Sequence, residues 1–133
     1  MGQHQTLLIF LTVLIVGIAT AIGIQIFEES AIQTNRDSIL EDLQVILDDA
    51  NAYALRPESS GGGDGSFDGY VIPAGLAGDE NGNYEIMVSN AKKKQKKGRL
   101  VLTGTSSKGY GLVRITVDDS LEIKNVTFEG EFK

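Results

Sequence analysis

The N-terminal part of the chain is a long run of apolar residues. Residues 7–27 contain no charged side chain, and Thr12, Thr20 and Gln25 are the clearly polar ones among them. At about 1.5 Å per residue, a helix of this length spans roughly 30 Å, the thickness of a bilayer hydrocarbon core. Such a run is too long and too apolar for the core helix of a small domain. The pattern predicts a helix that meets lipid or other copies of itself.

From residue 28 to residue 55 the apolar positions become periodic. They recur at three- and four-residue steps, at Ile32, Ile39, Leu40, Leu43, Ile46, Leu47, Ala50 and Tyr53. This spacing is typical of one apolar stripe on a helix. Seven acidic residues and the single base Arg36 lie between them. No proline or glycine interrupts residues 24–55, so we predict one continuous helix of about fifty residues. Pro57 and the glycines at 61–63 end it.

Beyond a loop at residues 59–69 the period changes to two. Strands are predicted at residues 84–89, 99–103, 112–117 and 120–128. Asn81-Gly82 is typical of a type I′ hairpin turn, and Lys108-Gly109 and Asp118-Asp119 mark two further turns. Short connections make neighbouring strands antiparallel. The fold class is therefore predicted as α+β: a long N-terminal helix, apolar and then amphipathic, on an antiparallel meander of about four strands. The predicted domains are residues 1–27, 28–55 and 56–133.

The amino-acid composition excludes most kinds of enzyme active site. The 133 residues include no cysteine and one histidine, His4, and the formal net charge is −6. Disulfides, thiolate metal sites, histidine-rich zinc sites and a Ser-His-Asp triad in the β-domain are excluded. No pairing among the carboxylates, lysines, serines and tyrosines stands out as a site. We therefore expect a protein that is not an enzyme, has no cofactor or bound metal, and has no general affinity for nucleic acid.

In this order of parts, the chain resembles the type IV pilins and their relatives. In sequence the resemblance is carried mainly by the first thirty residues, with Val16-Gly17-Ile18-Ala19 and Gln25-Ile26-Phe27 similar to the family's helix. It implies a subunit that waits in the cytoplasmic membrane. The pilus assembly machinery then extracts it into a helical filament of identical copies at the cell surface, for which adhesion is one use.

The chain departs from the family pattern near its start. Members commonly carry a basic leader ending in glycine; Gly2 is the only glycine before the apolar run, so processing there would leave Gln3 first. The glutamate usual at the fifth mature position is replaced by Gln5, or by Leu7 after such processing. The first contact between subunits is therefore assigned to one of these two residues. The usual mid-helix proline is also missing.

A cleaved signal peptide is an alternative interpretation of the apolar run. Ala19-Thr20-Ala21 matches the small-x-small cleavage pattern. No lysine or arginine precedes the run, although a signal peptide normally has a basic region there. Retention of the segment is the favoured prediction.

Small residues cluster in the middle of the apolar run. Gly17 and Ala21 form one small pair at i, i+4, and Ala19 and Gly23 form another, which allows helix backbones to approach closely. Each glycine also weakens a helix by about 1 kcal/mol relative to alanine. We predict that residues 17–23 lose helical hydrogen bonds first in the assembled state. The alternative is that glycine and alanine are simply ordinary in membrane helices.

Each of three further motifs could have a function or could be an ordinary feature of the fold. The basic run consists of Lys92, Lys93, Lys94, Lys96, Lys97 and Arg99. It could dock on the acidic helix of a neighbouring subunit or bind DNA or another negative surface, but a solvated loop that discourages strand pairing is favoured. Asp79-x-Asn81-x-Asn83 has the start of a calcium-loop spacing, yet a hairpin turn explains it better. Asn125-Val126-Thr127 is a glycosylation sequon.

Two functions, from different classes of protein, remain consistent with the sequence. The first is a structural subunit that polymerises through its apolar helix; the second is a single-pass, membrane-anchored extracytoplasmic binding module. A lone anchor needs flanking charge to set its orientation. Residues 1–27 offer only the amino terminus and His4. The sequence therefore favours the filament subunit.

Overall fold

The computed structural model describes residues 2–89, 99–118 and 120–133. It contains one long helix, α1 (Gly2–Leu55), a short 3₁₀ helix, η1 (Glu58–Ser60), and four strands. The predicted α+β class is confirmed, and α1 is continuous as expected. The chain divides into two compact units, Met1–Gln33 and Thr34–Lys133, which are described separately. The domain boundaries expected from the sequence remain predictions.

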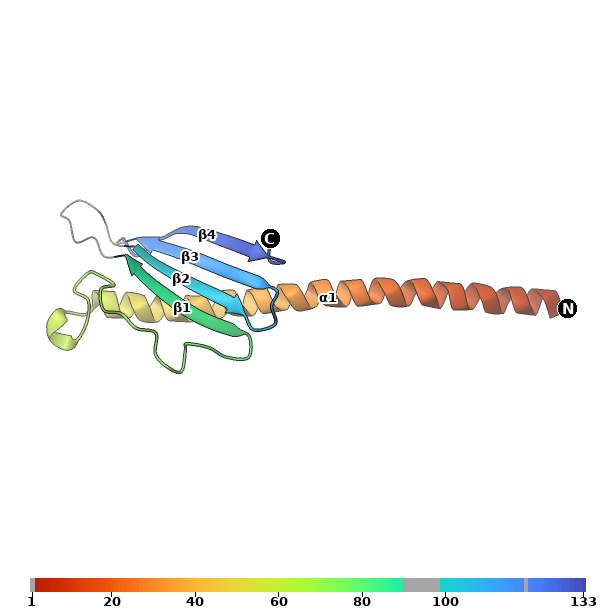
Figure 1. Cartoon of the computed structure of the whole chain (residues 1–133), viewed down its shortest axis with the longest axis horizontal. Helices are drawn as coiled ribbons and strands as arrows, with labels where there is room; N and C mark the ends of the chain where they lie inside the picture. The colour runs from red at the N-terminus through yellow and green to blue at the C-terminus, as the bar shows by residue number, and fades with distance from the viewer. Residues whose placement is uncertain (1, 90–98, 119) are drawn as a thin grey trace. The chain divides into compact units, whose positions relative to one another are not determined.

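The four strands form one antiparallel meander in the order β1-β2-β3-β4 (Figure 1). They are β1 (Gly82–Ser89), β2 (Arg99–Ser106), β3 (Gly111–Asp118) and β4 (Ile123–Gly130). Each of the four predicted strands is therefore present. β4 begins three residues later than expected because the chain turns first: the Leu121 amide donates to the Asp118 carbonyl at 3.0 Å, and Leu121 has a φ of 63°.

One face of the sheet packs on the C-terminal part of α1, within the unit Thr34–Lys133. Burial alternates along β2, as expected for a strand with one covered face. The core residues from the helix are Ile39, Leu43, Ile46, Leu47, Ala50 and Ala54, and those from the sheet include Tyr84, Leu100, Leu102, Val113, Ile115 and Val117. The predicted apolar stripe thus supplies the helix side of the core.

Glycine lets the helix and sheet approach closely at β2. A methyl group added at Gly104 would lie 2.7 Å from Cγ2 of Ile39 and 3.1 Å from the ring of Tyr84. A contact of 2.7 Å essentially never occurs for a real Cβ atom, and one of 3.1 Å is unusually tight, so a side chain at this position would force its neighbours to move. The packing of α1 on the sheet therefore depends on the absence of a side chain at this residue.

The predicted type I′ turn at Asn81-Gly82 is wrong. That turn needs positive φ at both central residues, and neither Asn81 nor Gly82 has it. Instead the turn comes earlier, where the Asp79 carboxylate accepts the backbone amides of Asn81 at 2.9 Å and Gly82 at 3.1 Å. Gly82 is the first residue of β1, and a methyl group there would lie 2.5 Å from the carbonyl oxygen of Thr105. The glycine serves close strand pairing, not the turn.

The glycine-rich loop after α1 folds back on the helix end. The amides of Gly63 and Gly65 donate to the carbonyls of Tyr53 and Ala54 at 2.9 and 2.7 Å, and the Asp64 amide donates to Arg56 at 3.0 Å. The last carbonyls of a helix have no partner within it. The loop supplies those partners and terminates α1 where the sequence predicted.

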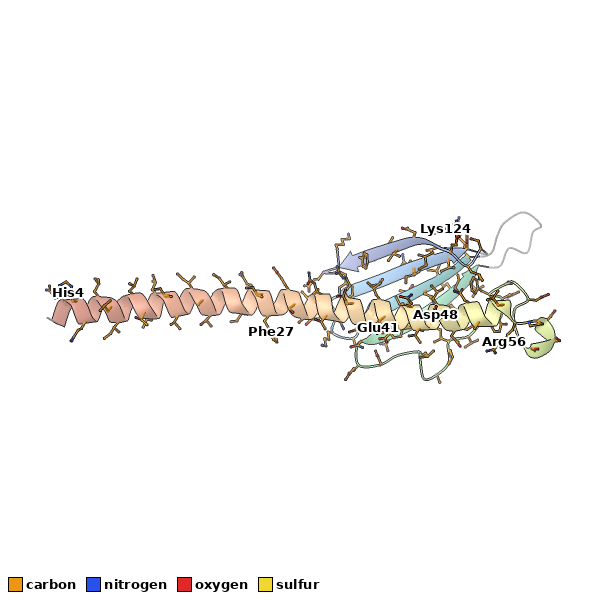
Figure 2. The ribbon with its side chains drawn as sticks, turned by 180° about the vertical axis from the view of Figure 1, so that it is seen from behind. His4, Phe27, Glu41, Asp48, Arg56 and Lys124 are labelled. Carbon is orange, nitrogen blue, oxygen red and sulfur yellow. The ribbon has the colours of Figure 1, made fainter. Side chains whose placement is uncertain are left out.

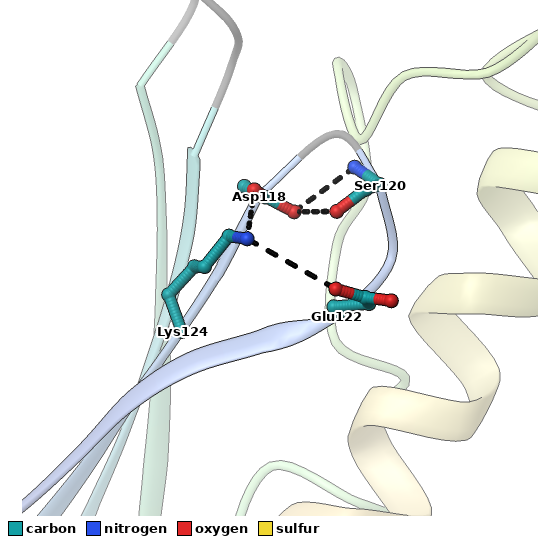
Figure 3. A network of polar contacts seen from close by, with 4 residues as sticks. All are labelled: Asp118, Ser120, Glu122 and Lys124. Atoms are coloured by element: carbon teal, nitrogen blue, oxygen red, sulfur yellow. Dashed lines mark hydrogen bonds and ion pairs between the residues drawn. The ribbon is translucent and has the colours of Figure 1, made fainter.

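The β3–β4 turn is held by a small polar network (Figure 3). The Asp118 carboxylate accepts hydrogen bonds from the hydroxyl and the amide of Ser120, and Nζ of Lys124 lies 3.2 Å from it. Nζ also lies 4.0 Å from Glu122. The Ser120 hydroxyl, helped by Lys124, lowers the pKa of Asp118 to about 2. The turn therefore keeps its negative charge at any ordinary pH.

Candidate assembly segment

The apolar run is exposed along its whole length in the unit Met1–Gln33. Every residue from 7 to 27 is solvent-exposed, and Phe10 and Phe27 expose 72% and 76% of their surface. Isolated exposed apolar side chains are normal, but a contiguous surface of them marks a site that meets another protein or a membrane. By length and composition, this helix is able to cross a bilayer. Its side chains are drawn in Figure 2.

The hydroxyl groups of this segment are already satisfied by its own backbone. Thr6, Thr12 and Thr20 donate to the carbonyls four residues earlier, at 2.8, 2.8 and 2.7 Å. An unpaired hydroxyl is costly to bury in an apolar environment, whereas one bonded to the preceding turn is not. The segment can therefore enter lipid or a protein core without exposing these polar groups.

The two glycines of the segment, Gly17 and Gly23, pack against no other described part of the chain. A methyl group at Gly17 or Gly23 would meet nothing within 4 Å, outside the helix's own backbone. Gly17 and Ala21 point in directions only about 40° apart on a helix with 3.6 residues per turn. The pair Ala19 and Gly23 lies about 200° away, on the opposite side. The segment thus offers two surfaces for close approach, facing in opposite directions.

The other predicted assembly residues lie at the start of the same helix. Gly2, Gln5 and Leu7 are in the first turns of α1, and all three are exposed. Processing after Gly2 and a first subunit contact at Gln5 or Leu7 stay predictions. In the single chain α1 is uninterrupted across residues 17–23. The predicted loss of helical bonds concerns the assembled state and also stays a prediction.

The remaining motifs are dispersed over the other unit. Lys92, Lys93, Lys94, Lys96 and Lys97 lie outside the described residues. Asn125 is exposed on β4, opposite Thr116, and is accessible for modification. The Asp79–Asn83 motif forms the tight turn described above, and the described residues contain no group of three or more potential His, Cys, Asp or Glu metal ligands.

Polar contacts from α1 to the sheet and to the loop before β1 were missed by sequence reasoning. The Tyr84 hydroxyl donates to Asp42 at 2.6 Å, the Tyr70 hydroxyl donates to Asp49 at 2.7 Å, and the Ser106 hydroxyl donates to the buried Asn35 at 2.6 Å. A signal existed: Asn35, Asp42 and Asp49 recur at seven-residue spacing, on the stripe that holds Ile39 and Ile46. These positions turn toward the rest of the domain, where Asn35 and Asp42 find partners on the sheet and Asp49 finds one in the loop before β1.

These contacts make stability sensitive to high pH. Burial raises the pKa of Tyr84, and the hydrogen bond to Asp42 and the negative charges of Asp42 and Asp79 raise it further. Unfolding then releases a proton above pH about 10, the ordinary pKa of tyrosine. The free energy of unfolding is therefore unaffected below that pH and falls as pH rises above it.

Tyr84→Phe is expected to reduce this alkaline loss. The variant lacks the proton that Tyr84 releases on unfolding. That proton lowers the free energy of unfolding by about 1.4 kcal/mol for each pH unit above the ordinary tyrosine pKa. It also destabilises the protein at neutral pH by about 1–3 kcal/mol, because Asp42 loses a donor. Denaturant unfolding of detergent-dispersed subunits between pH 7 and 12 measures both effects. Tyr110→Phe is the matched control; an equal change of slope in that variant would contradict the assignment.

No family model, curated protein or solved structure matches this chain.

Proposed function

We propose that this protein is a structural subunit that polymerises through its apolar N-terminal helix into an extracellular, pilus-like filament. The observation that carries the proposal is the state of residues 7–27: every residue is exposed, none is charged, and the threonine hydroxyls bond to the helix's own carbonyls. The rest of the chain, Thr34–Lys133, has its own core and would form the displayed surface. A resemblance to the type IV pilins in the order of parts agrees with this function.

The hydrophobic effect keeps the assembled helices out of water. Relative to exposure to water, burying apolar surface among copies of the same helix is favourable by about 25 cal/mol per Å². Neither disulfides nor histidine ligands take part, since the chain has no cysteine and only His4. The filament core is therefore expected to resist salt and chelators. Before assembly the same helix would reside in the cytoplasmic membrane.

A filament explains the apolar helix better than a lone anchor does. A lone membrane anchor has no use for two close-approach surfaces. A helix in the core of a polymer has neighbours on several sides. The opposite placement of Gly17/Ala21 and Ala19/Gly23 supplies contacts in two directions. A dimer would need only one of them.

The test is to shear material from the surface of cells that express the chain. We expect thin filaments by electron microscopy, with this chain as their main protein by mass spectrometry, and we expect them to survive 1 M salt and chelator, as a core without ionic bonds does. Detergent extraction that yields only dispersed monomers, with no filaments in the sheared fraction, would overturn the proposal. That result would support the membrane-anchored binding module instead.

A further inference from the structure

The peptide bond between Asn81 and Gly82 joins the loop before β1 to the strand itself. In this dipeptide the asparagine is prone to lose its side-chain amide. Glycine places no side chain in the way when the next backbone nitrogen attacks the asparagine side chain. Asparagine is among the thermolabile residues, and Asn81 is only half-buried, within reach of water. The pair therefore has the chemistry of a modification site.

The reaction at this pair needs only water. The Gly82 amide nitrogen gives up its proton and bonds to Cγ of Asn81, and the Cγ–Nδ2 bond breaks. Nδ2 takes up a proton and leaves as ammonia, so a five-membered imide ring remains. Water then opens the ring and leaves aspartate or isoaspartate at position 81. No oxidant, reductant or other co-reactant takes part.

In the folded unit Thr34–Lys133 the attacking nitrogen is occupied. The Gly82 amide donates to Oδ1 of Asp79 at 3.1 Å. A hydrogen bond to a carboxylate stabilises the protonated amide, so the nitrogen loses its proton less readily. The Gly82 carbonyl also accepts the Asp79 amide at 2.9 Å. The Gly82 nitrogen therefore cannot turn onto the Asn81 side chain without breaking these bonds.

The side chain under attack is held as well. Nδ2 of Asn81 donates to Oδ2 of Asp79 at 3.1 Å and to Oδ2 of Asp42, on α1, at 3.4 Å. The Asn81 carbonyl accepts the Ser107 amide, just after β2, and Nδ2 of Asn35, on α1, both at 3.1 Å. These partners come from the loop before β1, from the sheet side and from the helix. Asn81 thus keeps all its bonds only while helix and sheet stay together.

Both residues of the reactive pair have a structural role. A methyl group at Gly82 would lie 2.5 Å from the carbonyl oxygen of Thr105, so the strand pairing requires glycine there. The Asn81 amide donates to two carboxylates. A carboxylate in its place would remove that donor and add a third negative charge beside Asp42 and Asp79. The fold therefore uses a chemically unstable pair and protects it by holding it.

We propose that Asn81-Gly82 is a latent deamidation site, protected in the folded unit and open to reaction when α1 and the sheet separate. The change is one-way, because the new carboxylate opposes the return of residue 81 to its place beside Asp42 and Asp79. The extent of deamidation then records how long a chain has spent in the open state. The inference concerns this unit alone and holds whether or not the chain polymerises.

The test follows deamidation in the detergent-dispersed full chain, by mass spectrometry of the peptide that contains Asn81. The folded native chain is expected to stay amidated, and the same chain unfolded in urea to deamidate fastest. Asp79→Ala removes the acceptor of the Gly82 amide. Its folded form should deamidate about 10- to 100-fold faster than the native protein, as loss of a hydrogen bond to a charged group implies. Glu80→Ala removes an exposed carboxylate next to the site and should match the native rate.

Low concentrations of urea, below the unfolding transition, distinguish local release from separation of helix and sheet. The native rate should rise with urea, because separation exposes surface, whereas the faster rate of Asp79→Ala should depend little on it. The native chain alone supplies this measurement if the variant does not fold. A native rate that ignores urea, or a folded native chain that deamidates as fast as the unfolded one, would overturn the proposal.

Asn81→Asp imitates one product of the reaction. It is expected to raise the unfolded fraction about tenfold or more in denaturant unfolding, since a donor is lost and a negative charge is added beside two carboxylates. Asn83→Asp makes the same chemical change at an exposed position of β1 and should leave stability close to native. If Asn81→Asp were as stable as Asn83→Asp, deamidation would not oppose refolding, and the one-way step would be wrong.

Discussion

Leucine at Gly17 and Gly23 is expected to abolish filament assembly while leaving the subunit in the membrane. Neither position contacts anything within its own chain beyond the helix backbone, so leucine fits the single helix without a clash. Leucine also favours a helix over glycine by nearly 1 kcal/mol per site. In a close-packed bundle each added side chain costs about 1–3 kcal/mol through overpacking. The same substitution therefore stabilises the helix and disrupts its assembly.

The measurement compares sheared filaments with the membrane content of the subunit. Ile18→Leu with Ile24→Leu is the matched control, since it places leucine at adjacent, equally apolar positions of the same segment. That control should assemble. If the variant with leucine at Gly17 and Gly23 forms filaments as readily as the control, close approach at the small residues is not part of the core.

Gly104→Ala is expected to destabilise the unit Thr34–Lys133 by about 1–3 kcal/mol, as overpacking of a buried site does. The new methyl group would lie 2.7 Å from Cγ2 of Ile39. Ile39→Ala removes that atom and by itself costs about 2–5 kcal/mol. Because the two changes meet at one contact, the double variant should lose less stability than the sum of the single ones, by about 0.5–3 kcal/mol.

Denaturant unfolding of the detergent-dispersed chain gives all three values. Gly75→Ala is the control, because a methyl group at Gly75 would meet nothing within 4 Å. It should change the free energy of unfolding by less than about 0.5 kcal/mol. Additive losses in the double variant would mean that helix and sheet do not meet at Gly104 as described.

The helix and the four strands could be predicted because their signals are local. A change of apolar period from 3.6 to two marks where helix gives way to sheet. The apolar positions Ile39, Leu43 and Ile46 named from that period are buried in the structure. Turn residues predicted the order of strands, since short connections leave only an antiparallel meander.

What escaped prediction depends on residues far apart in the chain. Ser106 and Asn35 are separated by 71 positions, so their hydrogen bond follows from how sheet and helix align and not from any local pattern. Gly82 carried a turn signal but serves a close strand contact, and nothing in the dipeptide distinguishes the two uses. Phe67 is buried although it lies in a glycine-rich loop, because that loop folds back on the helix end.

The sequence predicted which residues are candidates for assembly, but it did not show what surrounds them in the folded chain. The sequence showed that Gly17, Ala19, Ala21 and Gly23 are small. Their use as contact surfaces depends on two features of the single chain. The helix α1 is continuous across them, and no other described part of the chain lies within 4 Å of a methyl group placed at Gly17 or Gly23.

The threonine hydroxyls that bond to their own helix affect whether the proposed assembly is reversible. Thr6, Thr12 and Thr20 donate their hydroxyls to carbonyls of their own helix. Moving the helix from lipid to a protein core therefore breaks none of these hydrogen bonds. Lipid tails and apolar side chains are also equivalent surroundings, so packing alone decides between them. Under the proposed function, the transfer of this helix between bilayer and polymer would be close to balanced in free energy. Recycling of subunits from a shortened polymer back into the membrane would then need no chemical change in the chain.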